Sequence, residues 1–443
     1  MAEERSEPSG PLDAFRQFFA LRRDVLVLSL AMFAFSLAFQ MTSRFLPRYI
    51  ELLGASGFVV GLFGTAGNVV SAVYPYPGGA ISDRVGSRTA LTLFGLLATA
   101  GFAVWLVAPA AGTLSVAGLT VEPWVWVFVG LLLAQAWKSL GLGAAFAVVK
   151  QATEPSRLAA GFASTETFRR TAFLLGPALA TVLIGLSPVF TMSFRYVLAA
   201  AVLFGAVGTV VQHLLYDAGS DTLGDSFAGL EGVRRDLREM PAPLRPLLVG
   251  DTLVRFANGM VYVFFILVVT DLYAVGLEST LSVGGFSYAL DLSPEAFFGL
   301  LLSLEMAVAL LVMAPAAKAA ERVGLKPVVA LGFAVYAVFP VVLIAAPATP
   351  LAMALVFAFS GLRFAGLPSH KALIVGPAES DAGGRVTGTY YLLRNTVVIP
   401  SAALGGYLWD FVSPEVAFGL AAAIGLVGTG YFLVFGEEFE AYR

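Results

Sequence analysis

Long apolar runs, rather than an alternation of polar and apolar residues, dominate this chain from about residue 25 to residue 436. Most runs hold roughly 20–25 residues or more, the length of helix that crosses a hydrocarbon core of about 30 Å. Unbroken runs favour helices over strands, because membrane strands alternate in polarity about every second residue. The pattern predicts twelve membrane-spanning helices, at 25–49, 58–81, 89–109, 123–149, 158–186, 193–216, 246–274, 296–317, 327–347, 350–377, 386–408 and 414–436.

The composition supports this interpretation. Only 13% of the residues are charged, whereas about a quarter are charged in a typical soluble domain. We therefore expect an all-α polytopic membrane protein, and the internal repeat described below divides it into two pseudo-symmetric six-helix halves. Its expected segments are a cytoplasmic N-terminus with an interfacial helix (1–24), an N-terminal half (25–216), a cytoplasmic linker (217–245), a C-terminal half (246–436) and a cytoplasmic tail (437–443).

The basic residues predict how the chain is oriented. Most of the 27 Lys and Arg residues fall on the side of the two chain ends, whereas Arg44, Arg48 and Arg195 fall at the other face. Because basic residues are retained on the cytoplasmic side, we expect both termini in the cytoplasm and the protein in the cell membrane. Six bases lie inside predicted spans: Lys138, Arg169, Arg170, Arg255, Arg363 and Arg394.

The side chains that are missing narrow the function classes. The chain has no cysteine, and its two histidines, His213 and His370, are far apart in sequence. This argues against thiolate chemistry and against a metal site with ligand spacing. No phosphate-binding Gly-x-x-x-x-Gly-Lys-Ser/Thr signature is present. We expect no catalytic residues, no metal, no cofactor and no nucleic-acid partner. A polytopic membrane enzyme or a transporter-derived receptor is the alternative from a different class.

The connector after the second predicted span recurs in the second half of the chain. Residues 77–88 read PGGAISDRVGSR and residues 315–326 read PAAKAAERVGLK, so an acid, Arg, Val, Gly and a base follow in the same order. Lys138 in the fourth span likewise corresponds to Arg363 in the tenth. Two similar six-helix halves predict a transporter whose binding site lies at the interface between the repeats.

This connector resembles the signature of the major facilitator superfamily, Gly-x-x-x-Asp-Arg-x-Gly-x-Arg between the second and third helices. The matching residues are Gly79, Asp83, Arg84, Gly86 and Arg88, with a degenerate copy at Glu321, Arg322, Gly324 and Lys326. The resemblance covers essentially the whole chain and implies the fold of that superfamily. It also implies that the connector is a conformational latch, which joins the halves while the transporter is open outward. The alternative is a basic loop that only fixes the topology.

The resemblance also implies where the substrate binds. In that superfamily helices 1, 4, 7 and 10 line a central cavity, whereas helices 2, 5, 8 and 11 form the interface between the halves. Lys138, Arg255 and Arg363 are therefore candidate substrate-binding residues. The candidate interface residues are Arg169, Arg170, Arg394, Gly176 and Pro177. The stretch AFLLGPAL in the fifth span partly resembles an element of drug/proton antiporters, although an alanine replaces its first glycine.

Two carboxylates lie deep in predicted spans. Glu305 has apolar neighbours and no opposite charge within one turn, so we expect its pKa to be raised and the carboxyl to carry a coupling proton. The alternative is a structural pair with one of the intramembrane bases. Glu166 is the reserve candidate, because Arg169 and Arg170 follow it at three and four residues and favour its ionised form.

Together these features predict a monomeric secondary active transporter of a small organic solute, working by alternating access with protons as the coupling ion. The connector and the partial antiporter element favour proton-coupled export. The excess of bases inside the spans favours the alternative, uptake or exchange of an organic anion metabolite, because unpaired buried cations are costly.

Overall fold

The computed structural model describes residues 23–116, 119–141, 144–145, 158–216, 240–283, 286–375 and 383–438. The expected interfacial helix near residues 11–24 lies almost wholly outside these ranges, as does most of the expected linker at 217–245. Within the described ranges each of the twelve predicted spans contains helix. Among the residues that the structure describes, eight helices are long and apolar enough to cross a membrane, and Gly57–Val73 is a shorter apolar helix.

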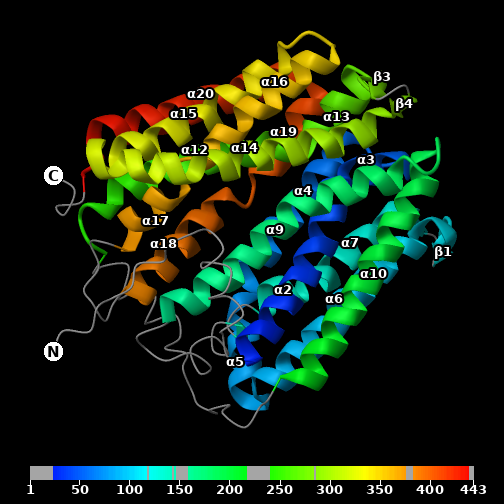
Figure 1. The fold of residues 1–443 in the computed structure, drawn as a ribbon, viewed down its shortest axis with the longest axis horizontal. Helices are drawn as coiled ribbons and strands as arrows, with labels where there is room; N and C mark the ends of the chain where they lie inside the picture. Colours follow the sequence, from blue (N-terminus) through cyan, green and yellow to red (C-terminus); the bar gives the residue numbers. More distant parts are fainter. Residues whose placement is uncertain are drawn as a thin grey trace.

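The N-terminal half forms one elongated bundle (Figure 1). Its elements are α2 (Arg23–Thr42), α3 (Leu46–Leu52), α4 (Gly57–Val73), α5 (Pro75–Val85), α6 (Ser87–Ala111), α7 (Pro123–Gln135), the π-helical η1 (Ala136–Leu140), α9 (Leu158–Ile184) and α10 (Phe190–Leu215).

The C-terminal half forms a second bundle, which lies across the first (Figure 1). Its elements are α12 (Leu244–Val261), the 3₁₀ turn η4 (Tyr262–Phe264), α13 (Phe265–Leu267), the π-helical η5 (Val268–Leu272), α14 (Pro294–Val323), α15 (Leu325–Ile344), α16 (Pro350–Gly361), the 3₁₀ turn η6 (Leu362–Phe364), α17 (Leu367–Val375), α18 (Gly383–Val398), α19 (Ser401–Phe411) and α20 (Pro414–Phe435).

Local sequence fixes where several helices begin. α14, α16 and α20 each start with proline at the first turn, preceded by Ser293, Thr349 or Ser413. Each of these hydroxyls accepts a hydrogen bond from a backbone N–H of the first turn, at 3.2–3.3 Å. Proline lacks an N–H that would otherwise be unpaired there, and the hydroxyl satisfies another. Capping therefore sets these three boundaries.

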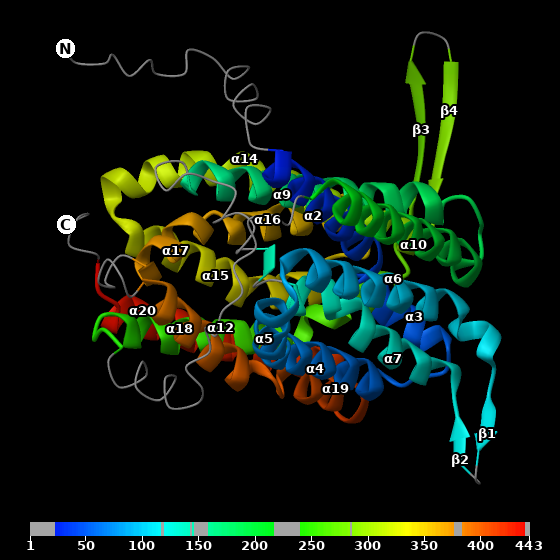
Figure 2. The same cartoon turned by 90° about the horizontal axis from the view of Figure 1, so that it is seen from below.

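Two short hairpins were not expected from the sequence. β1 (Leu114–Val116) pairs with β2 (Leu119–Val121), and β3 (Leu277–Val283) pairs with β4 (Phe286–Leu292), both antiparallel. They occupy the loops 110–122 and 275–295, for which the sequence showed no motif. Both project from the same end of the helical bundle (Figure 2). We call this end the hairpin side, and the opposite end, where α2 begins and α20 ends, the terminal side.

The repeated connectors have the same backbone geometry. α5 ends at Val85 and α6 starts at Ser87, so Gly86 alone joins them, with φ of 82°. In the second half Gly324 alone joins α14 to α15, with φ of 92°. Glycine is the residue that adopts positive φ without strain. The structure therefore confirms that the two halves repeat each other at this turn.

The connector side chains are only partly described. The side chain of Asp83 lies outside the described set, whereas Arg84, Glu321 and Arg322 are exposed. Arg88 donates its Nε–H to the carbonyl of His213 at 2.9 Å, within the N-terminal half. In the second connector the carboxylate of Glu438 accepts the backbone N–H groups of Leu325 and Lys326 at 3.0 and 2.9 Å. The latch role of these residues stays a prediction.

Close packing in the first connector falls on Gly78 rather than on Gly79. A Cβ added at Gly78 would lie 2.1 Å from the carbonyl oxygen of Leu140, whereas one added at Gly79 meets nothing within 4 Å. We expect Gly78→Ala to lower the melting temperature, because an overpacked contact costs about 1–3 kcal/mol. Gly79→Ala should leave it equal or slightly higher, since alanine is the better helix former. Thermal unfolding of both purified variants tests this, and equal melting temperatures would contradict it.

The two halves meet on the hairpin side and diverge towards the terminal side (Figure 1). Near the hairpin side Phe58 donates its backbone N–H to Asp410 of α19 at 2.6 Å. Gly61 of α4 packs directly on Gly406 of α19, where an added Cβ would lie 2.9 Å from the Cα of Gly406. Thr181 of α9 donates to the carbonyl of Ala296 in α14 at 3.0 Å. Contacts between α4 and α19 (the second and eleventh spans) and between α9 and α14 (the fifth and eighth spans) thus close the bundle at this end.

Candidate substrate cavity

The four spans that the resemblance places around a central cavity all depart from regular α-helix. The first is divided into α2 and α3, and the fourth passes from α7 into π-helical η1. The seventh contains η4 and η5, and the tenth is interrupted by η6. Interruptions of this kind inside helices often mark functional sites, and in transporters they free backbone groups that line a cavity.

A cavity of about 250 Å³ lies between the halves. Gly64 and Asn68 of α4 belong to the N-terminal half, and the remaining lining comes from α12, η4, α18 and α19 of the C-terminal half. Its lining residues are Gly64, Asn68, Arg255, Asn258, Gly259, Tyr262, Val263, Arg394, Asn395, Val398 and Ala402. Two guanidinium groups and three amides thus supply hydrogen bonds to whatever enters.

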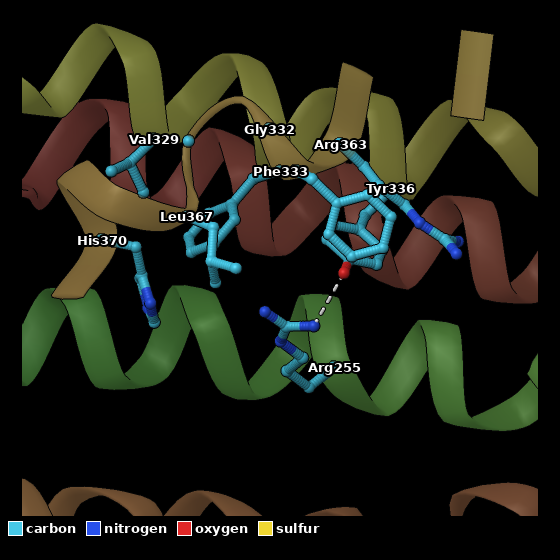
Figure 3. A pocket seen from close by; sticks show the side chains of 10 residues that line it. Arg255, Val329, Gly332, Phe333, Tyr336, Arg363, Leu367 and His370 are labelled. Atoms are coloured by element: carbon cyan, nitrogen blue, oxygen red, sulfur yellow. Dashed lines mark hydrogen bonds between the residues drawn. The ribbon is translucent and has the colours of Figure 1, made fainter. Parts of the chain in front are cut away.

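Asp251 holds both arginines of the cavity wall. Its carboxylate is completely buried and accepts from Nε of Arg255 at 3.2 Å and from Nη1 of Arg394 at 3.1 Å. Arg255 also donates Nη1–H to the hydroxyl of Tyr336 at 2.9 Å (Figure 3), and Arg394 donates twice to the amide oxygen of Asn395. Two cations share one anion, so this part of the wall is net positive.

Sequence reasoning missed two further partners of Asp251. His370 of α17 and Tyr390 of α18 are both buried, and each contacts the Oδ2 atom, at 3.2 and 3.1 Å. In the sequence these residues are separated from Asp251 by more than a hundred positions, and no local pattern links them. Arg394, predicted in an interface helix, lies in the cavity wall as a member of this cluster.

Glu305 pairs with one of the intramembrane bases, which is the alternative that the sequence left open. Arg363 of η6 places Nη2 2.7 Å from Oε1 of Glu305, and both side chains are buried. Ser360 donates its hydroxyl to the same oxygen. The pair forms because α14 packs on α16 and η6. Arg363 has Nε and Nη1 left without a hydrogen-bond partner among the described atoms, so its donors are only partly used.

Arg44 lies in the interior rather than at the outer face where the sequence placed it. Only 8% of it is exposed, and its guanidinium lies 3.7 Å from the ring centroid of Tyr262, which lines the cavity. The charge of Arg44 interacts with those of Glu305 and Arg363. Its Nη2 has no partner in the described part of the chain. The turn between α2 and α3 directs this side chain inwards, which the sequence did not indicate.

The other candidates lie around the cavity rather than in its wall. Lys138 of η1 has its Nζ 4.4 Å from the ring centroid of Phe39 in the same half. Arg169 lies 5.1 Å from the ring of Phe173, and Arg170 contacts the sulfur of Met313 across the interface at 3.6 Å. The side chain of Glu166 is outside the described set, so its pairing with these arginines is untested.

Gly176 and Pro177 contribute to packing on different neighbours of α9. A Cβ at Gly176 would lie 2.7 Å from the Cβ of Gln40, so this glycine brings α9 close to α2 within the N-terminal half. The carbonyl of Pro177 faces Gly299 of α14 across the interface, 3.0 Å from an added Cβ. Both residues therefore position helices and do not line the described cavity.

An ion cluster joins the halves on the hairpin side. Arg48 of α3 contacts Glu51 of the same helix at 2.9 Å, Asp271 of η5, and Glu295 of α14 at 3.4 Å. Three carboxylates thus surround one guanidinium. Partial burial first, and then the negative charge of Asp271, raise the pKa of Glu51 to about 7 despite its bond to Arg48.

This cluster predicts a pH-dependent closure of the hairpin side. Opening would separate Glu51 from Asp271 and return its pKa towards about 4.3. The closed state then holds the extra proton between these two values, so closure should be favoured as the pH falls below about 7 and lost as the pH rises through it. Because the chain has no cysteine, spin labels on an introduced cysteine pair across this side can measure the closed fraction. Glu51→Gln should make it independent of pH.

Glu122 is the matched control for that experiment. It lies on the same side of the molecule and contacts Thr113 at 3.3 Å. It is not a member of the cluster around Arg48. Glu122→Gln should keep the pH dependence of the parent. If the closed fraction of the Glu51→Gln variant responds to pH as strongly as that of the parent, the carboxyl of Glu51 has no role in the pH dependence.

Comparison with known proteins agrees with the fold. Residues 28–290, more than half of the chain, match the family model of the Major Facilitator Superfamily. A mutant of the nucleoside transporter NupG superposes with a TM-score of 0.71 at 12% identity, covering 93% of this chain and 100% of the other. A POT family transporter in complex with 5-aminolevulinic acid gives 0.68 at 14%, covering 95% and 99%. The peptide transporter POT in complex with sulfate gives 0.68 at 15%, covering 96% and 99%.

A search of curated protein sequences gives no match to this chain. The structural similarities, at identities below a quarter, establish the fold alone, whereas the family model covers most of the N-terminal half and part of the C-terminal half. Together with the duplicated connector and the cavity between the halves, they identify the chain as a multi-pass membrane transporter and not an enzyme. It belongs to the major facilitator superfamily.

Proposed function

We propose that this protein carries a small organic anion across the cell membrane by alternating access, coupled to protons. The observation that carries the proposal is the net positive wall of the cavity between the halves, where Arg255 and Arg394 share the single charge of Asp251. Arginine suits carboxylates and phosphates, because its planar fork offers paired donors. The amides of Asn68, Asn258 and Asn395 can bind the polar groups of the rest of the substrate.

Arg363 and Lys138 are further proposed contacts for the substrate. Arg363 keeps two donor atoms free of partners in the described structure and lies beside Arg255 at a small cavity in the C-terminal half. Lys138 presents an ammonium from the N-terminal half. An anion held between them would contact both halves, which is what a substrate must do to favour the change between the two open states.

The proton carrier that we propose is Glu305, with Glu166 in reserve. In the ionised form Glu305 occupies one donor of Arg363. A proton on Glu305 would weaken that pair and release the guanidinium towards a substrate anion. The connector favours export of the substrate in exchange for protons. The basic cavity favours uptake or exchange of an anion metabolite. The two alternatives differ in the direction in which the proton gradient drives the substrate.

The closed hairpin side is the basis for the conformational state that we propose for this structure. With both termini in the cytoplasm, the described structure is closed outward, so the connector that includes Asp83 should be released as a latch. Hydrogen bonds across α4 and α19 and across α9 and α14 support this assignment. We propose that the protein works as a monomer, because each chain contains both halves and the cavity between them.

Flux into vesicles with the purified protein tests the proposal. Nucleosides, short peptides and 5-aminolevulinic acid should be included, because solved structures of similar fold come from transporters of these kinds, together with monocarboxylates, dicarboxylates and organic phosphates. Saturable flux of an anion that responds to an imposed pH gradient is expected. Arg255→Gln and Arg394→Gln should weaken it, whereas Arg195→Gln, on the exposed hairpin side, should not. Flux that is faster for cations would reject the proposal.

A further inference from the structure

The buried pair of Asp251 and His370 connects the charge of the cavity wall to an imidazole, a side chain that can bind a proton. Asp251 is fully buried and His370 is 3% exposed. Four donors reach this one carboxylate: Arg255 on Oδ1, and His370, Tyr390 and Arg394 on Oδ2, all at 3.1–3.2 Å. Three of these donors crowd Oδ2, so a new positive charge beside that oxygen must compete with those already bound.

The bond to Asp251 fixes which nitrogen of His370 carries the hydrogen. A carboxylate only accepts, so Nε2 of His370 is the donor, and in the neutral ring Nδ1 is then the acceptor. A proton can therefore add at Nδ1 while the Nε2–H bond to Asp251 stays intact. A cavity of about 20 Å³ lies beside His370 and Arg255 (Figure 3). It is large enough for one water molecule.

The groups that face His370 come from three neighbouring helices. Asp251 and Arg255 lie on α12, Tyr390 and Arg394 on α18, and the ring of Phe333 on α15 packs edge-on at 5.8 Å. Arg363 shares the lining of the small cavity. Because Asp251 is the acid in direct contact, the charged form of His370 is stabilised by it and opposed by the arginines.

We propose that His370 is a proton-binding residue that sets how firmly Asp251 holds Arg255 and Arg394. When His370 is protonated, its bond to Asp251 becomes stronger and the bonds of Arg255 and Arg394 to that carboxylate become weaker. Both guanidinium groups then bind more strongly to an anion in the cavity. The proton and the anion then bind together. This inference rests on the proposed anion cavity, and it adds a second titrating group, in a different cluster from Glu305 and Arg363.

The chain has two histidines, which supplies a matched control. His213 is exposed in the N-terminal half, where its Nδ1 contacts the hydroxyl of Thr92 at 3.1 Å. We would measure the affinity of the full-length protein for sulfate by calorimetry at constant ionic strength, between about pH 5 and pH 8, where histidine titrates. Sulfate keeps its charge over this range, so any pH dependence belongs to the protein.

The parent should bind sulfate about tenfold more tightly at the acid end, within the range of about 5- to 150-fold that is typical of coupled sites. His213→Gln should keep this dependence, and His370→Gln should reduce it while retaining a donor for Asp251. In a Glu305→Gln background, which removes the contribution of that carboxyl, adding His370→Gln should abolish the dependence that remains. Equal pH dependence in the parent and in His370→Gln would overturn the inference.

A second measurement leaves His370 in place and so avoids a folding defect. In the His213→Gln background only the His370 ring gives an imidazole signal, which can be titrated by NMR with and without saturating sulfate. Coupling is reciprocal, so a tenfold effect on affinity should raise the midpoint of His370 by about one pH unit. An unmoved midpoint would overturn the inference.

The two proposals fail in different ways. If the parent binds sulfate equally well at both pH values, the cavity for an anion stands and the role of His370 is overturned. If the parent binds no sulfate at any pH, the anion cavity itself is overturned and the inference with it.

Discussion

Asp251→Asn should lower the free energy of unfolding by about 3–5 kcal/mol, the cost of removing one partner from a buried ion cluster. The side chain is 0% exposed and balances Arg255 and Arg394. Asparagine is neutral, and its amide nitrogen would point a donor at groups that are already donors. Both guanidinium groups would then remain in a poorly solvated site without a counter-charge.

Denaturant titration of the purified protein in detergent measures this loss. Asp410→Asn is the matched control: Asp410 is exposed and accepts one backbone N–H, that of Phe58. Asparagine retains an oxygen that can accept the same bond, so we expect a change of about 1 kcal/mol or less there. Similar losses in both variants would show that the Asp251 cluster is not held by its charges.

Glu305→Gln should abolish accumulation driven by a proton gradient while leaving exchange of substrate for substrate intact. Glutamine resembles the protonated carboxyl and keeps an oxygen that can accept from Arg363 and Ser360. The substitution therefore preserves the fold but removes the group that gains and loses the proton. Without the negative charge, the bond to Arg363 would stay in its weakened form throughout the cycle.

Vesicles with an imposed pH gradient distinguish the two modes. Glu415→Gln is the control, because Glu415 is a carboxyl in the first turn of α20, in the half of the molecule that contains Glu305. It should accumulate substrate like the parent. A Glu305→Gln protein that still accumulates substrate against its gradient would leave Glu305 with only a structural role, and the coupling proton would have to be carried elsewhere.

The sequence predicts the helices and the repeat well because both are local. A run of about 20 apolar residues is enough to specify a span, and a glycine that joins two helices is visible as Gly86 and again as Gly324. The sequence left open whether Glu305 pairs with an intramembrane base and which one, and the partner is Arg363, two spans further along the chain. Which arginine a buried acid meets depends on how helices pack, and one sequence does not carry that information.

Position along a span was also an incomplete guide to exposure. Arg44 follows α2 and precedes α3, which suggests the membrane surface, yet a three-residue turn directs its side chain onto Tyr262. Asp251 lies near the start of its predicted span, yet it is the centre of a cluster from α12, α17 and α18. Its partner Arg394 is 143 positions away in the sequence. Long-range contacts of this kind decide which charges are available to a ligand.

The interruptions in the first, fourth, seventh and tenth spans have a consequence for how the hairpin side opens. Each interruption separates a segment on the hairpin side from the rest of its helix, as α3 is separated from α2 and η5 from α12. Bending at these points breaks fewer hydrogen bonds than bending a regular stretch of helix, since the ladder is already irregular there. Gating can therefore begin as a local hinge motion of short segments. Their amide hydrogens should exchange with solvent while those of α2 and α12 remain protected, so the halves need not rotate as rigid bodies from the start.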